Sequence, residues 1–257
     1  METEFIRINK FLSEAGVCSR RGADRLVVEG RVSIDGKKAV LGDQILPGQK
    51  VLVDGREVQR EDEKILLAFH KPKGIVCTAE KREKNNIIDY LHYPKRIYPV
   101  GRLDKDSEGL ILLTNDGELG NEILRARNFH EKEYIVTVNR PVTDEFLRGM
   151  AGGVPILDTI TRKCKVEKLD KRKFRIVLTQ GLNRQIRRMC EYFGYQVVKL
   201  KRIRIMNIML GDLPTGSYRE ISREEQEELY RRIQGSSNQP VRENRGRREE
   251  WKKKDSE

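Results

Sequence analysis

The sequence has few of the residues on which disulfide scaffolds and metal centres depend. Its four cysteines are spread over 257 residues with no C-x-x-C pair, and its three histidines are equally isolated. Structural zinc sites and disulfide frameworks require closely spaced or paired ligands. We therefore expect reduced thiols, no bound metal, and a protein of a reducing compartment such as the cytoplasm.

Long apolar runs and nucleotide-binding motifs are missing as well. No apolar stretch approaches the roughly 20 residues that a membrane-spanning helix needs. The N-terminal sequence METEFIRINK lacks the apolar core of a signal peptide. Neither a P-loop nor a G-x-G-x-x-G fingerprint is present. These absences favour a cytoplasmic protein that does not span a membrane.

What the sequence has in excess is positive charge. It contains 52 Lys and Arg against 40 Asp and Glu, which gives a net charge of +12 and an isoelectric point near 9.5. Such a balance indicates a polyanionic partner. Nucleic acid is the commonest partner of this kind, and an acidic membrane surface is the main alternative.

Hydrophobic periodicity and turn signals divide the chain into three parts. Residues 1–62 form a compact first module, and a polar stretch at 59–64 links it to a larger domain at 63–233. Residues 234–257 contain almost no apolar side chains and cannot bury a core, so we expect a disordered basic tail.

The larger domain contains several strand patterns with a few helical patterns between them. Strands are predicted at 65–69, 110–114, 133–138, 164–169, 174–179 and 197–205, and helices at 118–126, 142–150, 185–194 and 223–233. Runs of strands with occasional helices favour an α+β fold with a mainly antiparallel sheet.

The first module places positive charge where a helix does not favour it. Its second helix begins after Ser19, a typical N-cap, and Arg20 and Arg21 occupy the first turn. The helix macrodipole disfavours cations there, whereas a phosphate bound at the same helix start would favour them. For any single arginine, a solvated basic face is the better explanation. Several cations around one helix start favour contact with RNA.

The order of these elements resembles the S4 RNA-binding domain. The resemblance rests on CSRRGADRLVVEGRVSIDGK, which follows a first helix and ends in a small hairpin with an Asp-Gly turn, with a second such turn in VDGREV. It covers roughly residues 5–60. The resemblance implies that six side chains face RNA: Arg7, Lys10, Ser19, Arg20, Arg21 and Arg31.

An acidic loop, GRLDKDSEGLILLTNDG, stands out against the basic background. Asp104, Asp106 and Glu108 imitate the start of a calcium-binding loop, but Leu112 and Asn115 stand where oxygen ligands would be required. A plain hairpin turn explains the glycines of the loop. It does not explain a carboxylate directly beside an apolar leucine, which needs a positive partner.

A catalytic carboxylate is the third interpretation of the loop. It requires a positive partner and a group on which a base can stack. Tyr134 begins the strand EYIVTV, and the helix at 185–194 presents arginines beside a buried face formed by Ile186, Met189, Cys190 and Phe193. An arginine at the edge of that face can reach a carboxylate.

These stretches together resemble the RsuA/RluB/RluE/RluF family of pseudouridine synthases, over residues 5 to about 230. The motifs are KPKGIV at 71–76, GRLDKDSEGLILLTNDGEL at 101–119, EKEYIVTV at 131–138 and GLNRQIRRMCEYFGY at 181–195. The wording of the last stretch looks most like the large-subunit RluF branch. The resemblance implies an S4 domain followed by a pseudouridine synthase catalytic domain.

The resemblance also implies the chemistry. Uracil is detached from C1′ of a flipped uridine, turned, and rejoined through C5. Asp104 is implied as the catalytic carboxylate, acting as a nucleophile or removing a proton from C2′. Arg187 is implied to pair with it, Tyr134 to stack on the base, and Leu200 to line the base pocket. No cofactor or metal is implied, because the reaction is an isomerisation.

Further positions follow with less support from the motifs. Lys71, Arg102 and Arg184 are expected to contact RNA; Arg184 stands where relatives often have histidine. Three cations after the pocket strand are expected to extend the RNA track: Lys201, Arg202 and Arg204. Asp106 and Glu108 are expected to shape the loop, Asp106 by accepting backbone N–H bonds. The implied substrate is 23S rRNA and the expected state a monomer. The alternatives are 16S rRNA or tRNA as the target, or a non-catalytic S4-type RNA-binding protein.

Overall fold

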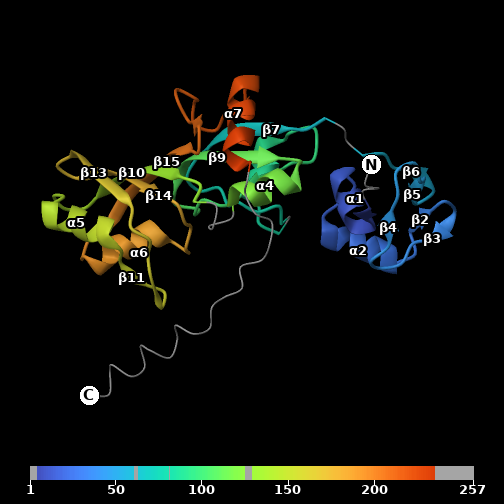
Figure 1. Ribbon diagram of the computed structural model, residues 1–257, viewed down its shortest axis with the longest axis horizontal. Coiled ribbons are helices and arrows are strands. Elements are labelled where there is room, and N and C mark those ends of the chain that lie inside the picture. Colours follow the sequence, from blue (N-terminus) through green and yellow to red (C-terminus); the bar gives the residue numbers. More distant parts are fainter. Residues whose placement is uncertain (1–4, 61–62, 81, 125–128, 235–257) are drawn as a thin grey trace, which may run out of the picture.

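The computed structural model describes residues 5–60, 63–80, 82–124 and 129–234. Apart from Gln234, the tail predicted at 234–257 lies outside these residues. Figure 1 shows a small module at one end of the molecule and a larger sheet-based region that forms the rest. None of the helices in the described ranges is long and apolar enough to cross a membrane.

The small module contains the two predicted helices and both predicted hairpins. Ser19 caps the second helix, with its hydroxyl accepting the Gly22 N–H at 3.1 Å. Asp35 and Gly36 both have positive φ, as a type I′ turn requires. The elements are β1 (Ile6–Arg7), α1 (Ile8–Glu14), α2 (Arg20–Val28), β2 (Val32–Ile34), β3 (Lys37–Lys38), β4 (Gln44–Ile45), β5 (Val51–Val53) and β6 (Arg56–Glu57).

The larger region is built on one twisted sheet. In the described residues this sheet has nine strands, in the order β13-β14-β10-β15-β9-β7-β17, with β8 on β9 and β16 on β15. Its strands are β7 (Leu66–Lys71), β8 (Tyr98–Val100), β9 (Glu108–Thr114), β10 (Lys132–Val138), β13 (Lys165–Asp170), β14 (Lys173–Leu178), β15 (Val197–Ile205), β16 (Ile208–Met209) and β17 (Tyr218–Glu220). Among the described strand pairs of this sheet, only β9 with β15 is parallel. The predicted α+β fold with a mainly antiparallel sheet is confirmed.

Helices cover the two halves of this sheet separately, as Figure 1 shows. Helices α5 (Asp144–Gly152) and α6 (Gln185–Tyr192) pack on β10 and β14 around Phe146, Phe174 and Met189. Helices α4 (Gly117–Leu124) and α7 (Arg223–Ile233) pack on β7, β9 and β15. The short helix α3 (Ile87–Leu91) and the hairpin of β11 (Pro155–Ile156) and β12 (Thr159–Ile160) were not predicted, because elements this short leave little periodic signal.

The two halves meet where β9 runs beside β15. Gly109 lies at this junction with φ of +113°, and a Cβ atom there would stand 2.2 Å from the carbonyl oxygen of Arg202. Only glycine permits this approach. The close contact fixes the loop before β9, which contains the acidic residues, against the strand that crosses the middle of the sheet.

Candidate active site

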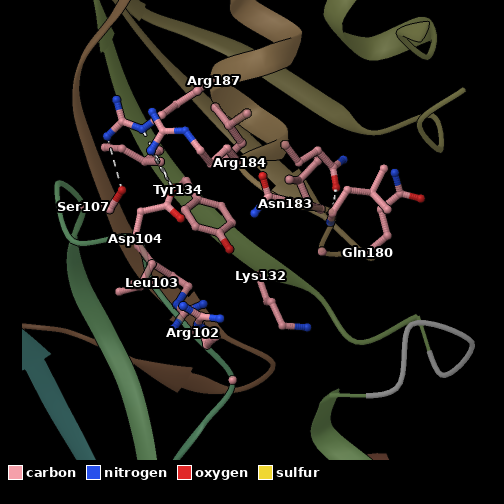
Figure 2. A pocket seen from close by; sticks show the side chains of 18 of the residues that line it. Arg102, Leu103, Asp104, Ser107, Lys132, Tyr134, Gln180, Asn183, Arg184 and Arg187 are labelled. Atoms are coloured by element: carbon pink, nitrogen blue, oxygen red, sulfur yellow. Dashed lines mark hydrogen bonds and ion pairs between the residues drawn. The ribbon is translucent and has the colours of Figure 1, made fainter. Parts of the chain in front are cut away.

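A pocket of about 450 Å³ opens at this junction. Its walls are the loop at 101–107, the strands β10 and β15, and the segment that leads into α6. Figure 2 shows Asp104 facing the space between Tyr134 and the arginines of that segment. A pocket of this size can enclose most of a nucleoside.

The loop that carries Asp104 is anchored on both sides of the aspartate. Leu103 is buried in an apolar cluster, and its N–H donates to Sγ of Cys77 at 3.3 Å. Ser107 is fully buried, and its N–H donates to the carbonyl of Asp104 at 3.0 Å. The carboxylate of Asp104 is therefore held at the pocket wall, with a third of its side chain exposed.

Lys71 supports this loop from below, which corrects the expectation that it contacts RNA. Its side chain is fully buried, and its ammonium donates to the carbonyl oxygens of Pro72 at 2.8 Å and Ser107 at 2.9 Å. Burial lowers its pKa below the usual range. The N–H of Gly74 donates to the carbonyl of Lys105 at 2.7 Å. The KPKG stretch thus holds the acidic loop in place.

Arg187 reaches the same loop from α6. It is 7% exposed, and its guanidinium donates to the carbonyl of Asp106 and to Oγ of Ser107, both at 3.3 Å. Its Nη2 lies 3.1 Å from Oδ2 of Asp106, whereas its Nε lies 3.9 Å from Oδ2 of Asp104. Its closer ion pair is with Asp106, so the predicted pair with Asp104 is present as a longer contact.

Arg184 brings a second guanidinium to the two carboxylates. It precedes α6 with φ of +48°, and its Nη1 lies 3.8 Å from Asp104 and 3.5 Å from Asp106. Asp106 therefore pairs with two arginines, and the expectation that it accepts backbone N–H bonds is wrong in the described structure. Glu108 pairs with Lys199 at 2.9 Å. Arg102 is exposed at the mouth of the pocket.

Tyr134 and Leu200 form the wall opposite Asp104. Tyr134 packs against two apolar clusters, one on each side of the junction. Leu200 is 5% exposed and lies opposite Val136 in the pairing of β10 with β15. Val136 shares the face of Tyr134, which lies two residues before it on β10, and residues opposite each other in a sheet share a face. Leu200 therefore lies on the face of Tyr134, and the side chains of Leu200 and Tyr134 both line the pocket.

Two further cations on this wall have no place in the predicted site. Lys132 lies two residues before Tyr134 and lines the pocket, as does Arg202. Arg202 was expected to continue a surface track for RNA, but it is 3% exposed and donates to the carbonyl of Leu110 at 2.6 Å. The two-residue repeat of β10 places Lys132 on the face of Tyr134, and that signal was available in the sequence.

The cations of the small module fall into two groups. Arg7, Arg20 and Arg21 are exposed, and no carboxylate of the described residues lies within ion-pairing distance of them. Arg31 instead forms a bidentate pair with Asp54, at 2.8 and 2.6 Å. Lys10 pairs with Glu118 of the larger region. Arg20 and Arg21 therefore remain the clearest surface for an anion.

Carboxylates, thiols and imidazoles of the described residues do not gather into a metal-binding group. No cluster of three or more such side chains occurs in these ranges. The acidic loop holds its carboxylates against arginines rather than around a cation site.

Comparison with known families finds a match for each of the two regions of the chain. The model of the RNA pseudouridylate synthase family matches residues 65–192, and the model of the S4 domain matches residues 6–50. The chain is 57% identical to the dual-specificity RNA pseudouridine synthase RluF of Salmonella typhi over 235 residues, 91% of this chain and 81% of the relative. The RluF of Escherichia coli K12 is 54% identical over 236 residues, with the same two coverages.

More distant relatives agree with these matches. Ribosomal large subunit pseudouridine synthase B of Bacillus subtilis is 36% identical over 232 residues, 87% of this chain and 95% of that protein. Among solved structures, a crystal structure of a pseudouridylate synthase superposes with a TM-score of 0.65 at 28% identity. That superposition covers 87% of this chain and 99% of the other.

Proposed function

This chain belongs to the RNA pseudouridylate synthase family, and from that premise we propose that Asp104 carries the chemistry on a uridine of 23S rRNA. The chain is an RNA pseudouridine synthase with an S4 domain, which sets aside the alternative of a non-catalytic binding protein. The proposal concerns which residues act and on which RNA.

The observation that carries this proposal is the position of Asp104. Its carboxylate faces a pocket that a base and ribose can enter, and two guanidiniums stand within 4 Å of it. Attack on C1′ and removal of the C2′ proton both require an ionised carboxylate at close range. The nearby arginines hold the loop around it through their contacts with Asp106.

The other pocket residues have roles that follow from their surroundings. Tyr134 offers a ring on which the flipped uracil stacks, and Leu200 closes the base pocket beside it. Arg187 is a positioning residue, because its bonds go to the carbonyl of Asp106 and to Oγ of Ser107 in the acidic loop. Arg102 and Arg184 lie near the mouth, where the phosphates flanking a flipped nucleotide would pass.

The substrate RNA is proposed from the relatives and from charge. The similar proteins are named for RNA pseudouridine synthesis, with dual specificity in the RluF proteins and the large ribosomal subunit in the Bacillus protein. We assign residues 1–62 to RNA binding through Arg7, Arg20 and Arg21, and residues 63–233 to chemistry. We propose 23S rRNA as the main target, tRNA as a second one, and action as a monomer in the cytoplasm.

The test compares the wild-type enzyme with Asp104→Asn and with Asp212→Asn, which alters an exposed aspartate away from the pocket. Each protein is incubated with unmodified 23S rRNA, 16S rRNA and tRNA, and pseudouridine is mapped by carbodiimide labelling and primer extension. We expect one 23S site that wild type and Asp212→Asn modify and Asp104→Asn does not, with RNA binding retained. Activity of Asp104→Asn, or modification of 16S rRNA alone, would overturn the assignment of residue or of target.

A further inference from the structure

Lys132 and Arg202 place two positive charges on the pocket wall opposite Asp104. Arg202 lies directly opposite Tyr134 in the pairing of β10 with β15, so both side chains leave the same face of the sheet. Lys132 precedes Tyr134 by two residues on β10 and shares that face. Figure 2 shows Lys132 and Tyr134 beside the hollow into which Asp104 points.

Arg202 is buried with unused hydrogen-bonding capacity. It is 3% exposed, and its Nε donates to the carbonyl of Leu110. Its Nη2 is buried and has no hydrogen-bond partner. The guanidinium carbon stands 6.0 Å from the centre of the Tyr134 ring, which places the charge beside the position proposed for the base.

The positive charge of Lys132 is also poorly compensated by its surroundings. Its ammonium makes one long contact, 3.4 Å to the carbonyl of His130. Burial and the nearby charge of Arg202 lower its pKa to about 8. No carboxylate in the described part of the chain lies within ion-pairing distance of Lys132 or Arg202.

Two other partly or fully buried arginines of the sheet region have anionic partners. Arg187 pairs with Asp106, and Arg204 pairs with Glu131 and Glu133. Burying a cation without such a partner costs stability, so the buried Arg202 and the half-buried Lys132 together indicate that an anion completes the site when substrate is bound. The occupied pocket must therefore bring negative charge to the face that carries Tyr134.

We propose that Lys132 and Arg202 bind the negative charge that develops on the uracil ring when it separates from the ribose. The inference rests on the proposed function, since it concerns the same pocket and the same reaction. It assigns to these residues stabilisation of the leaving group, a task that Asp104, on the ribose side, does not perform.

The electron balance of the reaction requires such a stabiliser. When the C1′–N1 bond breaks, its electron pair remains on the ring and is shared by N1 and the oxygens O2 and O4. C1′ is then joined to the Asp104 carboxylate, or forms a double bond to C2′ after the carboxylate has taken the C2′ proton. After the ring turns, C5 bonds to C1′ while the bond from C1′ to the Asp104 carboxylate breaks or, on the second route, while C2′ takes its proton back from Asp104. The C5 proton then leaves and N1 gains a proton. The atoms of uridine are conserved throughout.

The depth of the two cations favours the base over a phosphate as their ligand. Arg102 and Arg184 are exposed at the mouth and suit phosphates, which remain in solvent contact. Arg202 lies beneath the mouth at the level of the Tyr134 ring, where only the flipped base would reach. A preorganised charge at the point where charge develops is the most effective form of electrostatic stabilisation.

The test uses the full-length enzyme with Lys132→Met, Lys132→Arg and the control Lys168→Met, which alters an exposed lysine on β13. Single-turnover conversion of the target uridine is measured by chromatography of nuclease digests, and RNA affinity is measured separately. We expect Lys132→Met to convert uridine about 100-fold more slowly, with affinity changed less than about threefold. Lys132→Arg should recover much of the rate, and Lys168→Met should match wild type.

A second substrate separates leaving-group stabilisation from phosphate binding. RNA with 5-fluorouridine at the target carries a more stable uracil anion, so loss of this nucleoside in Lys132→Met should be slowed by about tenfold or less. Equal deficits with both nucleosides, a deficit in affinity alone, or wild-type rates would overturn the inference. Thermal unfolding confirms that each variant is folded. Asp104→Asn is tested in parallel. Its activity tests the role proposed for Asp104, and that result does not depend on the outcome for Lys132.

Discussion

The basic side chains at the start of α2 and those around the pocket share a charge but differ in exposure. Arg20 and Arg21 stand in solvent, whereas Arg187 and Arg202 are 7% and 3% exposed. An exposed cation attracts phosphates without fixing their positions, and salt weakens that attraction. A buried cation is held at one position by its hydrogen bonds, so it acts on one atom or group.

The comparison assigns different tasks to the two regions. We expect the exposed arginines of the small module to supply affinity that depends on salt and little on sequence. We expect the buried arginines of the pocket to act in the chemistry, since backbone carbonyls such as those of Asp106 and Leu110 orient them. Substitutions in the first region should change binding, and substitutions in the second should change the rate of the bound complex.

Replacement of Arg187 should give the largest loss of reaction rate. A change in RNA affinity instead would contradict the distinction between exposed cations that bind RNA and buried cations that act in the chemistry. Arg187→Gln removes the charge near Asp104 and the bonds to Asp106 and Ser107. We expect the single-turnover rate to fall by about 100- to 1,000-fold, with RNA affinity nearly unchanged. Arg187→Lys should recover only part of the rate, because an ammonium cannot reproduce the planar set of N–H donors of a guanidinium.

Arg188→Gln is the matched control for this substitution. Arg188 is the next residue of α6, is less buried, and donates to the carbonyl of Asn183 rather than to the acidic loop. Its substitution should leave the rate within about twofold of wild type. Thermal unfolding of both variants shows whether a loss of rate follows from a loss of fold, because removing one partner of a buried ion pair is itself destabilising.

The double substitution of Arg20 and Arg21 by alanine should give the next largest effect. It removes two exposed cations at a helix start, so RNA affinity should fall by about tenfold or more near physiological salt, and the slope of log affinity against log salt should flatten by about two. The rate at saturating RNA should be unchanged. Arg25→Ala, on the last turn of the same helix, serves as the control. An unchanged salt slope would show that this surface does not meet phosphates.

The sequence was sufficient to predict elements that have strong local signals. The N-cap at Ser19, the Asp35-Gly36 hairpin and the strand at 197–205 are found as predicted, because capping, positive φ and apolar alternation are local properties. The apolar face of α6 was predicted for the same reason. Its 3.6-residue period specifies the buried side without knowledge of what covers it.

The errors concern what surrounds a charged side chain. A lysine in KPKG and an arginine in KRIR look like surface cations in a basic protein, yet Lys71 and Arg202 are both buried. Their ligands are the carbonyls of Ser107 and Leu110, which lie 36 and 92 residues away. Backbone carbonyls carry no sequence signature, so contacts of this kind follow from the fold alone. The partners of Asp106 are the side chains of Arg184 and Arg187, and they were missed because the fold brings them from a distant part of the chain.

The reaction rate should depend on pH through Lys132, with a smaller effect than those of the substitutions above. This dependence tests whether a cation of the pocket acts on the rate. The pKa of Lys132 is lowered from 10.5 to about 8, mainly by burial and then by Arg202, so its charge is lost as pH rises above 8. The other charged and titratable groups that line the pocket are Asp104 and Arg102 on the loop, Tyr134 on β10, and Arg184 and Arg187 near α6. We expect the single-turnover rate to fall several-fold between pH 8 and 9.

The variant Lys132→Arg provides the check, because a guanidinium keeps its charge throughout this range. Its rate should stay level where that of wild type declines. Stability should change in the opposite direction, because between pH 8 and 10.5 the unfolded chain binds more protons at Lys132 than the folded chain does. The contribution of Lys132 to stability therefore rises with pH as activity falls. A parallel decline of both quantities would indicate unfolding rather than titration of this group.

Cys77 should give the smallest effect, because it acts on the site through a single weak bond. Its buried Sγ accepts the N–H of Leu103 at 3.3 Å, and burial raises the pKa of the thiol, so it stays neutral. Cys77→Ala leaves that N–H unpaired beside Asp104, at a cost of about 1–2 kcal/mol in unfolding free energy and about two- to fivefold in rate. Cys164→Ala, whose thiol bonds far from the loop to the carbonyl of Met150, should lower stability without changing the rate. Equal rate losses in the two variants would show that core packing, rather than the position of the loop, determines the effect.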